Sequence, residues 1–221
     1  LLVMLVVDAS GSNRFGTRGM LKIEQTALVG ATLAFLAIKN NDKVGLLFFT
    51  DEVEHYVPPA KGRTHVLRLV RDILYFQPKG TGTEPRIALE FVLHLLKRRA
   101  IVFFLSDLLG PGFTPAEIER PLSIMSRQHD TVVLSINDPA EETLPRLGWR
   151  EFVDAETGRR VVVDTSARRV QQWFQSERER RREELMRLFQ RLGIDHITLL
   201  TSVPFTPKLH QFFRERARRY R

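Results

Sequence analysis

The sequence predicts a doubly wound α/β domain in which helices flank a mostly parallel central sheet of about six strands. Segments typical of strands and of helices alternate along the chain, and this order builds parallel sheets. The predicted strands at residues 1–7 and 100–105 are continuous apolar runs, as expected for central strands buried on both faces, and further strands are predicted at 44–49 and 131–136.

The first half of the chain begins with the strand at 1–7, followed by a helix at 20–38 that is apolar on nearly every side. The segments 44–49 and 53–57 predict a hairpin at one edge of the sheet, and Pro58-Pro59 is expected to end its second strand. Four segments follow: an amphipathic helix at 63–76, a loop at 78–85, a helix at 86–96 and a strand at 100–105.

The second half contains a helix at 114–125, for which Thr114 is the predicted N-cap, Pro115 the first helical residue and Glu117 the partner of the cap. The strand at 131–136 leads into an insertion, about residues 138–165, that we expect at one end of the sheet. It carries a small hairpin, with strands at 152–153 and 161–163 around Glu156-Thr157-Gly158. Three elements close the chain: a long helix at 166–192 ended by Gly193, a strand at 197–200 and a helix at 206–219.

Length and composition indicate a single domain over residues 1–221 with a sizeable core, since 43% of the 221 residues are hydrophobic. The lack of cysteine excludes disulfides, zinc thiolate sites and cysteine nucleophiles. No apolar run reaches the ~18 residues of a membrane span, and no signal peptide is visible. Because Leu1 already lies in a strand segment, we expect a piece of a longer protein. We expect it in the cytoplasm, with any membrane attachment outside this chain.

Basic residues are concentrated in the C-terminal helices. The net charge is +8, and residues 139–221 alone carry 18 basic against 12 acidic groups. Glutamates alternate with arginines between residues 177 and 187, so we expect a solvated helix face with ion pairs four residues apart. The alternative is that these basic helices bind nucleic acid or another acidic surface.

Candidate metal ligands follow two of the predicted buried strands. Asp8, Ser10 and Ser12 form a D-x-S-x-S loop after the first strand, and Asp107 stands in the same relation to the strand at 100–105. If these strands are neighbours, both aspartates emerge at the carboxyl end of the sheet, where α/β proteins bind ligands. Thr83 adds a third hydroxyl, with Thr81 as the alternative in a shifted register. Such oxygens are donors that Mg²⁺ and Mn²⁺ prefer.

Together, Asp8-Ala9-Ser10-Gly11-Ser12, Thr83 and Asp107 resemble the metal-ion-dependent adhesion site of the von Willebrand factor A domain, which has a Rossmann-like fold. The resemblance extends over roughly residues 1–200. Further segments resemble the bacterial family of von Willebrand A-like proteins of unknown function that accompany MoxR-type AAA+ ATPases. These segments are Phe104-Leu105-Ser106-Asp107-Leu108-Leu109, Asn137-Asp138-Pro139-Ala140-Glu141 with Leu144-Pro145, and Asp154-Ala155-Glu156-Thr157-Gly158.

The resemblance implies a non-catalytic, divalent-cation-dependent protein interaction module. Ser10 and Ser12 would coordinate Mg²⁺ or Mn²⁺ directly, Thr83 directly or through water, and Asp8 and Asp107 would hold bound waters and supply negative charge. An acidic side chain of a partner protein would complete the coordination. The implied partner is a MoxR-type ATPase or its client, during assembly or maturation of other proteins. We expect neither a small-molecule substrate nor nucleic acid.

An enzyme is the alternative from a different functional class. A carboxylate after the first strand of such a sheet, together with Mg²⁺, also occurs in aspartyl-phosphate phosphatases. Those enzymes need a second acid two residues further on to protonate the leaving group, and here that position is the hydroxyl of Ser10. We therefore expect no catalytic residues, and a Mg²⁺-dependent hydrolase using Asp8 remains the alternative.

Overall fold

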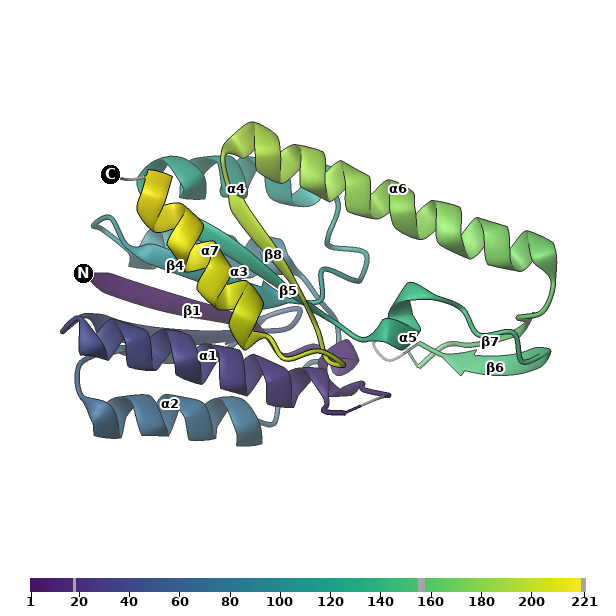
Figure 1. The fold of residues 1–221 in the computed structure, drawn as a ribbon, viewed down its shortest axis with the longest axis horizontal. Helices are drawn as coiled ribbons and strands as arrows, with labels where there is room; N and C mark the ends of the chain where they lie inside the picture. The colour runs from purple at the N-terminus through teal and green to yellow at the C-terminus, as the bar shows by residue number, and fades with distance from the viewer. Residues whose placement is uncertain (18, 155–157, 220–221) are drawn as a thin grey trace.

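Six strands form the central sheet in the order β3-β2-β1-β4-β5-β8, and every neighbouring pair except β2–β3 is parallel (Figure 1). The computed structural model describes residues 1–17, 19–154 and 158–219; the predicted turn residues Glu156 and Thr157 lie outside these ranges. The predicted sheet, with its antiparallel edge strand, is confirmed. Its strands are β1 (Leu2–Asp8), β2 (Lys43–Phe49), β3 (Val53–Ala60), β4 (Ile101–Ser106), β5 (Asp130–Asn137) and β8 (Asp195–Leu200).

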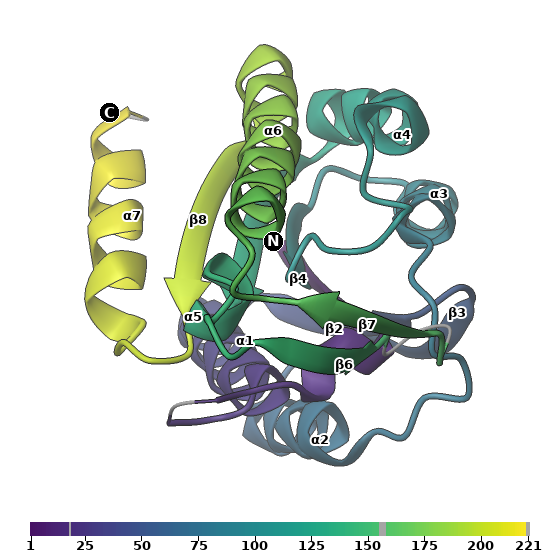
Figure 2. The same ribbon diagram turned by 90° about the vertical axis from the view of Figure 1, so that its right-hand side faces the viewer.

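Helices cover both faces of this sheet (Figure 2). Alternate residues of β1 enter separate cores: Val3, Leu5 and Val7 pack with α1, α2 and α7, whereas Met4 and Val6 pack with α3, α4 and α6. This is why β1 is an unbroken apolar run. The helices are α1 (Lys22–Lys39), α2 (Arg63–Tyr75), α3 (Pro85–Leu95), α4 (Pro115–Gln128), α5 (Pro139–Glu142), α6 (Arg168–Leu192) and α7 (Thr206–Arg219).

The predicted end of β3 at Pro58-Pro59 is wrong, because the strand continues through both prolines to Ala60. A proline removes a backbone donor, and this is tolerated on an edge strand, whose outer side has no partner strand. A register shift between Val44 and Leu46 of β2, which pair with Ala60 and Val57, accommodates the prolines.

The predicted side-chain cap of α4 is also not formed. Thr114 occupies the N-cap position and Pro115 the first helical position, but the Thr114 side chain makes no capping hydrogen bond. Instead, the Thr114 carbonyl accepts the backbone N–H of Glu117 at 3.1 Å. The short helix α5, which sequence analysis did not predict, does have a capping box, between Asp138 and Glu141.

The insertion after β5 projects beyond the carboxyl ends of the central strands, beside the N-terminal half of α6 (Figure 1). Its hairpin consists of β6 (Trp149–Val153) and β7 (Arg160–Asp164) and forms a separate two-stranded sheet. The side chain of Gln171 ties the insertion to α6 by donating to the carbonyls of Leu144 and Thr165, at 2.8 and 2.6 Å.

The ion-paired face predicted for the long helix is confirmed. Glu177 pairs with Arg180 and Arg181, and Arg187 pairs with Glu183, each within one turn of α6. Exposed pairs of this kind contribute at most about 1 kcal/mol each, so this charged face is hydrated and adds little to the stability of the fold. Within the described residues, no helix has an apolar stretch sufficient to cross a membrane.

His196 on β8 gives the fold a measurable pH dependence. Its ring packs on Phe189 and hydrogen-bonds Ser135 Oγ at 2.8 Å, and burial, followed by the charge of Arg182, lowers its pKa to about 4. An unfolded chain protonates this histidine near pH 6.5, so its contribution to stability is complete above that pH and is lost as the pH falls toward about 4.

We therefore expect His196→Gln, which can keep the bond to Ser135, to lose less unfolding free energy than the wild type as the pH falls from 6.5 to about 4. The difference should be on the order of 2 kcal/mol, measured by urea unfolding at a series of pH values. If the unfolding free energies of the two proteins change with pH in parallel, this prediction is wrong.

Candidate functional site

The first candidate loop is held by the carboxylate of Asp8, the last residue of β1. Asp8 is 1% exposed, and its oxygens accept hydrogen bonds from the Ser10 backbone N–H (2.9 Å) and from the Ser106 hydroxyl (2.6 Å). The bond to Ser10 closes a turn that leads the chain out of β1. The bond to Ser106 joins the carboxyl ends of the adjacent parallel strands β1 and β4.

The hydroxyls of Ser10 and Ser12 are neighbours in this loop. Their Oγ atoms are 3.1 Å apart, and Nδ2 of Asn13 donates to Ser10 Oγ at 3.4 Å. Two oxygens in adjacent positions of an octahedral Mg²⁺ shell, each about 2.1 Å from the ion, are about 3.0 Å apart. The spacing of the two serine hydroxyls therefore fits one such ion.

A backbone contact brings the loop at residues 80–83 to the first loop. The N–H of Gly11 donates to the carbonyl of Thr81 at 3.1 Å. Of the two threonines that the sequence offers, Thr83 is 6% exposed, whereas the side chain of Thr81 faces solvent. Burial beside the first loop favours Thr83 as the candidate ligand.

Glu54 on β3, which sequence analysis did not single out, holds the second loop in place. Its Oε1 accepts the backbone N–H groups of Lys79 (3.0 Å) and Gly80 (2.7 Å) and the hydroxyl of Thr50 (2.8 Å). A Cβ at position 80 would lie 2.4 Å from Oγ1 of the buried Thr50, so the close packing of this loop favours glycine there. The loop is therefore fixed by groups outside the motif.

Asp107, the residue after β4, faces a lysine in the interior. The ammonium of Lys22, in the first turn of α1, is fully buried and lies 2.6 Å from Oδ2 of Asp107. It forms a second ion pair with Glu141 of α5. The other oxygen of Asp107 accepts the backbone N–H of Leu109 at 2.9 Å. Both oxygens of Asp107 therefore have partners within the chain.

Lys22 and Glu141 were not among the site residues predicted from the sequence. The available signal was a lysine inside a helix that is otherwise apolar on nearly every side, because an ammonium buried there needs a buried anion. For Glu141 the available signal was Asp138-Pro139-Ala140-Glu141, an N-cap residue followed three residues later by a glutamate, which predicts a helix start but not the pairing with Lys22. The position of Glu141 depends on the capping box of α5, in which its Oε2 accepts the backbone N–H of Asp138 at 3.0 Å.

Negative charge exceeds positive charge in this cluster. Burial, followed by repulsion from Asp107, raises the pKa of Asp8 to about 7. Burial alone would lower the pKa of Lys22, but Asp107 and Glu141 outweigh burial and raise it, so Lys22 stays charged. The ammonium of Lys22 thus pairs with two of the three carboxylates, and a cation bound near Asp8 would offset the charge of the third.

No group of three or more His, Cys, Asp or Glu side chains is arranged to hold a metal within the described ranges. An ion at this edge of the sheet would therefore depend on hydroxyl and water ligands as well as carboxylates. The residues present fit that chemistry. Asp8, Ser10 and Ser12 share one loop, Asp107 acts on Asp8 electrostatically, and Thr83 is buried in the adjoining loop.

The chain is similar in sequence to curated proteins. The uncharacterized protein Mb1516 of Mycobacterium bovis is 29% identical over 168 residues, or 74% of this chain and 52% of that protein. The chain thus spans about half the length of the first curated relatives that it matches.

Among solved structures, the conserved hypothetical protein BatB of Bacteroides thetaiotaomicron is similar, with a TM-score of 0.59, 14% identity and 99% coverage of both chains. An aerotolerance-related membrane protein of Bacteroides fragilis has a TM-score of 0.53 and 16% identity, covering 86% of this chain and 99% of that one. Von Willebrand A domains also occur among the similar structures. Residues 1–184 match the family described as "Protein of unknown function DUF58", and the chain therefore belongs to the DUF58 family.

Proposed function

We propose that this domain is a non-catalytic protein interaction module whose binding depends on Mg²⁺ or Mn²⁺ held by Asp8, Ser10, Ser12, Thr83 and Asp107. One observation carries the proposal: two serine hydroxyls 3.1 Å apart adjoin a buried carboxylate whose hydrogen-bond donors, Ser10 N–H and Ser106, are both neutral. The ion would supply a Lewis-acidic centre with a coordination position for an acidic side chain of the partner.

Asp107 has a different role from the serines in this proposal. Its two oxygens are engaged by Lys22 and Leu109, so it acts on the ion through its charge and through bound water. The position two residues after Asp8 is Ser10, whose hydroxyl adjoins that of Ser12. A hydroxyl there cannot replace the general acid of a phosphatase, and this supports binding over catalysis.

Metal binding can be tested with Mn²⁺ alone, by electron paramagnetic resonance or calorimetry on the purified chain. We expect saturable binding that Mg²⁺ displaces and that Ser12→Ala weakens at least about tenfold, because one direct oxygen ligand is lost. Ser202→Ala, at an exposed serine before α7, is the matched control and should bind normally. Equal affinities for the two variants, with circular dichroism showing both folded, would refute the site.

The partner that we propose is a MoxR-type ATPase or a client protein that presents a carboxylate. Binding to a purified MoxR-type ATPase should require Mg²⁺ or Mn²⁺, disappear with EDTA and return when the metal is restored. Association with nucleic acid through the basic helices would instead depend steeply on salt and ignore EDTA. That second pattern, without metal-dependent protein binding, would overturn the proposed function.

A further inference from the structure

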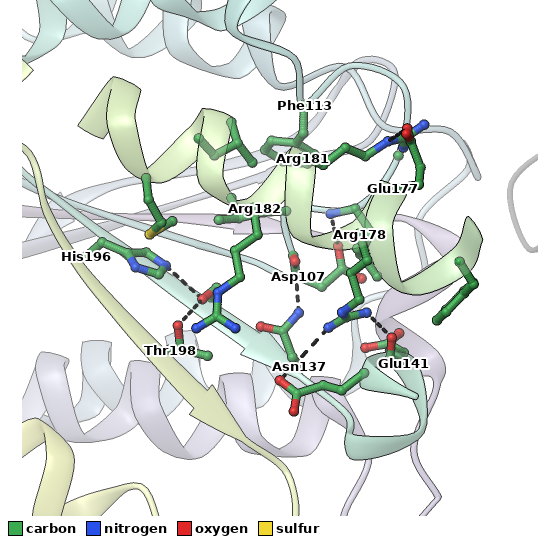
Figure 3. Close-up of a pocket in the computed structure, with 18 of the residues that line it drawn as sticks. Asp107, Phe113, Asn137, Glu141, Glu177, Arg178, Arg181, Arg182, His196 and Thr198 are labelled. Carbon is green, nitrogen blue, oxygen red and sulfur yellow. Dashed lines mark hydrogen bonds and ion pairs between the residues drawn. The ribbon is translucent and has the colours of Figure 1, made fainter. Parts of the chain in front are cut away.

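A cavity of about 460 Å³ lies beneath α6, against the carboxyl ends of β4 and β5 and the first half of β8 (Figure 3). This volume is within the ~300–1,000 Å³ typical of small-molecule sites. Its apolar wall includes Leu109, Phe113, Phe174, Leu185 and Met186, and its polar floor includes Ser135, Asn137, His196 and Thr198. The cavity therefore combines an apolar body with a polar end, as ligand sites do.

Three arginines of α6 line the cavity, and two of them have partners within the chain. Arg178 donates to the backbone carbonyl of Glu141, and Arg181 pairs with Glu177 at 2.9 Å. Among the described residues, no carboxylate lies within ion-pair distance of Arg182, and its guanidinium has no hydrogen-bond acceptor. Figure 3 shows the Arg182 side chain projecting from α6 into the cavity toward Thr198.

Four carboxylates also line the cavity, and each pairs with a cation of the chain other than Arg182, so the charge of Arg182 can serve an anion. Its charge acts on His196, which burial already disfavours in the charged form, so the ring is neutral at physiological pH and adds no second cation. Ser135 Oγ donates to Oγ1 of Thr198 at 3.3 Å, and the Arg182 side chain points toward Thr198 in Figure 3. A carboxylate matches a guanidinium through two parallel hydrogen bonds, a geometry that an ammonium lacks.

We propose that this cavity binds a free organic carboxylate with an apolar body, such as a medium-chain acyl acid. The carboxylate pairs with Arg182 above the Ser135 and Thr198 hydroxyls, and the hydrocarbon part lies against Leu109, Phe113, Leu185 and Met186. Binding in this cavity does not require the metal site. The carboxylate would be a bound small molecule of the proposed interaction module, and no reaction of it is implied.

The probe is octanoate, titrated into the purified chain by calorimetry in the presence of EDTA. We expect saturable binding, an increase in affinity of about fourfold per added methylene from hexanoate to octanoate, and much weaker binding of uncharged octanol. Arg182→Gln should weaken octanoate binding at least about tenfold. The matched control is Arg187→Gln, on the same helix but paired with Glu183 and outside the cavity, and it should bind octanoate normally.

A second variant tests the apolar part of the cavity and leaves the Arg182 guanidinium unchanged. Leu109→Trp fills the apolar part of the cavity from a loop position and should abolish octanoate binding while the unfolding midpoint stays close to that of the wild type. The proposal is overturned if octanoate does not saturate, or if Arg182→Gln and Arg187→Gln bind it equally. It is also overturned if only a carboxylate carried by a protein partner engages Arg182. Because EDTA is present throughout, failure here is distinguishable from failure of the metal site.

Discussion

Lys22→Met is expected to destabilise the folded protein by about 3–5 kcal/mol, because it leaves two carboxylates in the interior without their cation. Lys22 is fully buried and pairs with both Asp107 and Glu141. Methionine matches the length of the lysine stem, so packing changes little and the loss reports on charge. Urea unfolding at neutral pH measures the change directly.

The control for this substitution is Lys39→Met, in the last turn of the same helix. Lys39 is exposed, and its removal should cost only a few tenths of a kcal/mol through the helix dipole. Adding Asp107→Asn to Lys22→Met should recover part of the lost stability, since one of the orphaned charges is then absent. Equal losses for Lys22→Met and Lys39→Met would show that the buried pair contributes nothing.

The same variant tests the relation between Lys22 and the metal. With Lys22 gone, nothing on α1 neutralises Asp107, and the carboxyl end of the sheet becomes more negative. Mg²⁺ should therefore raise the unfolding free energy of Lys22→Met by more than it raises that of the wild type. An identical Mg²⁺ effect on both proteins would mean that Asp107 does not act on the ion.

The buried strands and the first loop could be predicted from sequence because their signals are local. Val3 to Val7 are all apolar, and Asp8, Ser10 and Ser12 follow directly. Parallel pairing of β1 with β4 then brings Asp8 near Ser106 and Asp107, which the order of the elements predicts. Doubly wound topology, more than any single residue, made this part of the site predictable.

The groups that complete the site could not be predicted because they come from unrelated segments. Glu54 positions the loop at 80–83 from the edge strand, and Glu141 reaches Lys22 across 119 residues of sequence. The cavity under α6 depends on how a helix that lies late in the chain crosses the sheet edge. Such contacts are set by tertiary packing, and neither hydrophobic periodicity nor a sequence motif predicts them.

Asp138→Ala is the second substitution with a large expected effect, a loss of about 3 kcal/mol, because it removes one acceptor from several donors at once. The carboxylate of Asp138 is fully buried and accepts the backbone N–H and hydroxyl of Thr17, the hydroxyl of Thr201 (2.8 Å) and the N–H of Ala140 (2.9 Å). It thus joins the segment after the first loop to the end of β8 and to α5. Asp72→Asn, at a partly exposed pair with Arg68, is the control and should lose less than about 1 kcal/mol.

The effect of Asp138 should depend on pH in a defined direction. Burial alone would raise its pKa, but the hydrogen bonds from Thr17, Ala140 and Thr201 outweigh burial and lower the pKa to about 2. Since an unfolded aspartate titrates near 3.9, the stability that Asp138 supplies is complete above about pH 4 and is lost as the pH falls through about 2. The gap between wild type and Asp138→Ala should therefore narrow in acid, and a gap that is constant with pH would contradict this account.

Asp138 is not a candidate ligand, yet its loss should reach the metal site. It fixes Thr17, only a few residues after Ser12, and caps the helix that carries Glu141, the second partner of Lys22. We expect Asp138→Ala to weaken Mn²⁺ binding at temperatures where the variant is still folded, whereas Asp72→Asn leaves it unchanged. Unchanged Mn²⁺ affinity in folded Asp138→Ala would mean that the first loop keeps its ligand geometry through Asp8 and Ser106 alone. In that case, the network around Asp138 stabilises the fold without shaping the site.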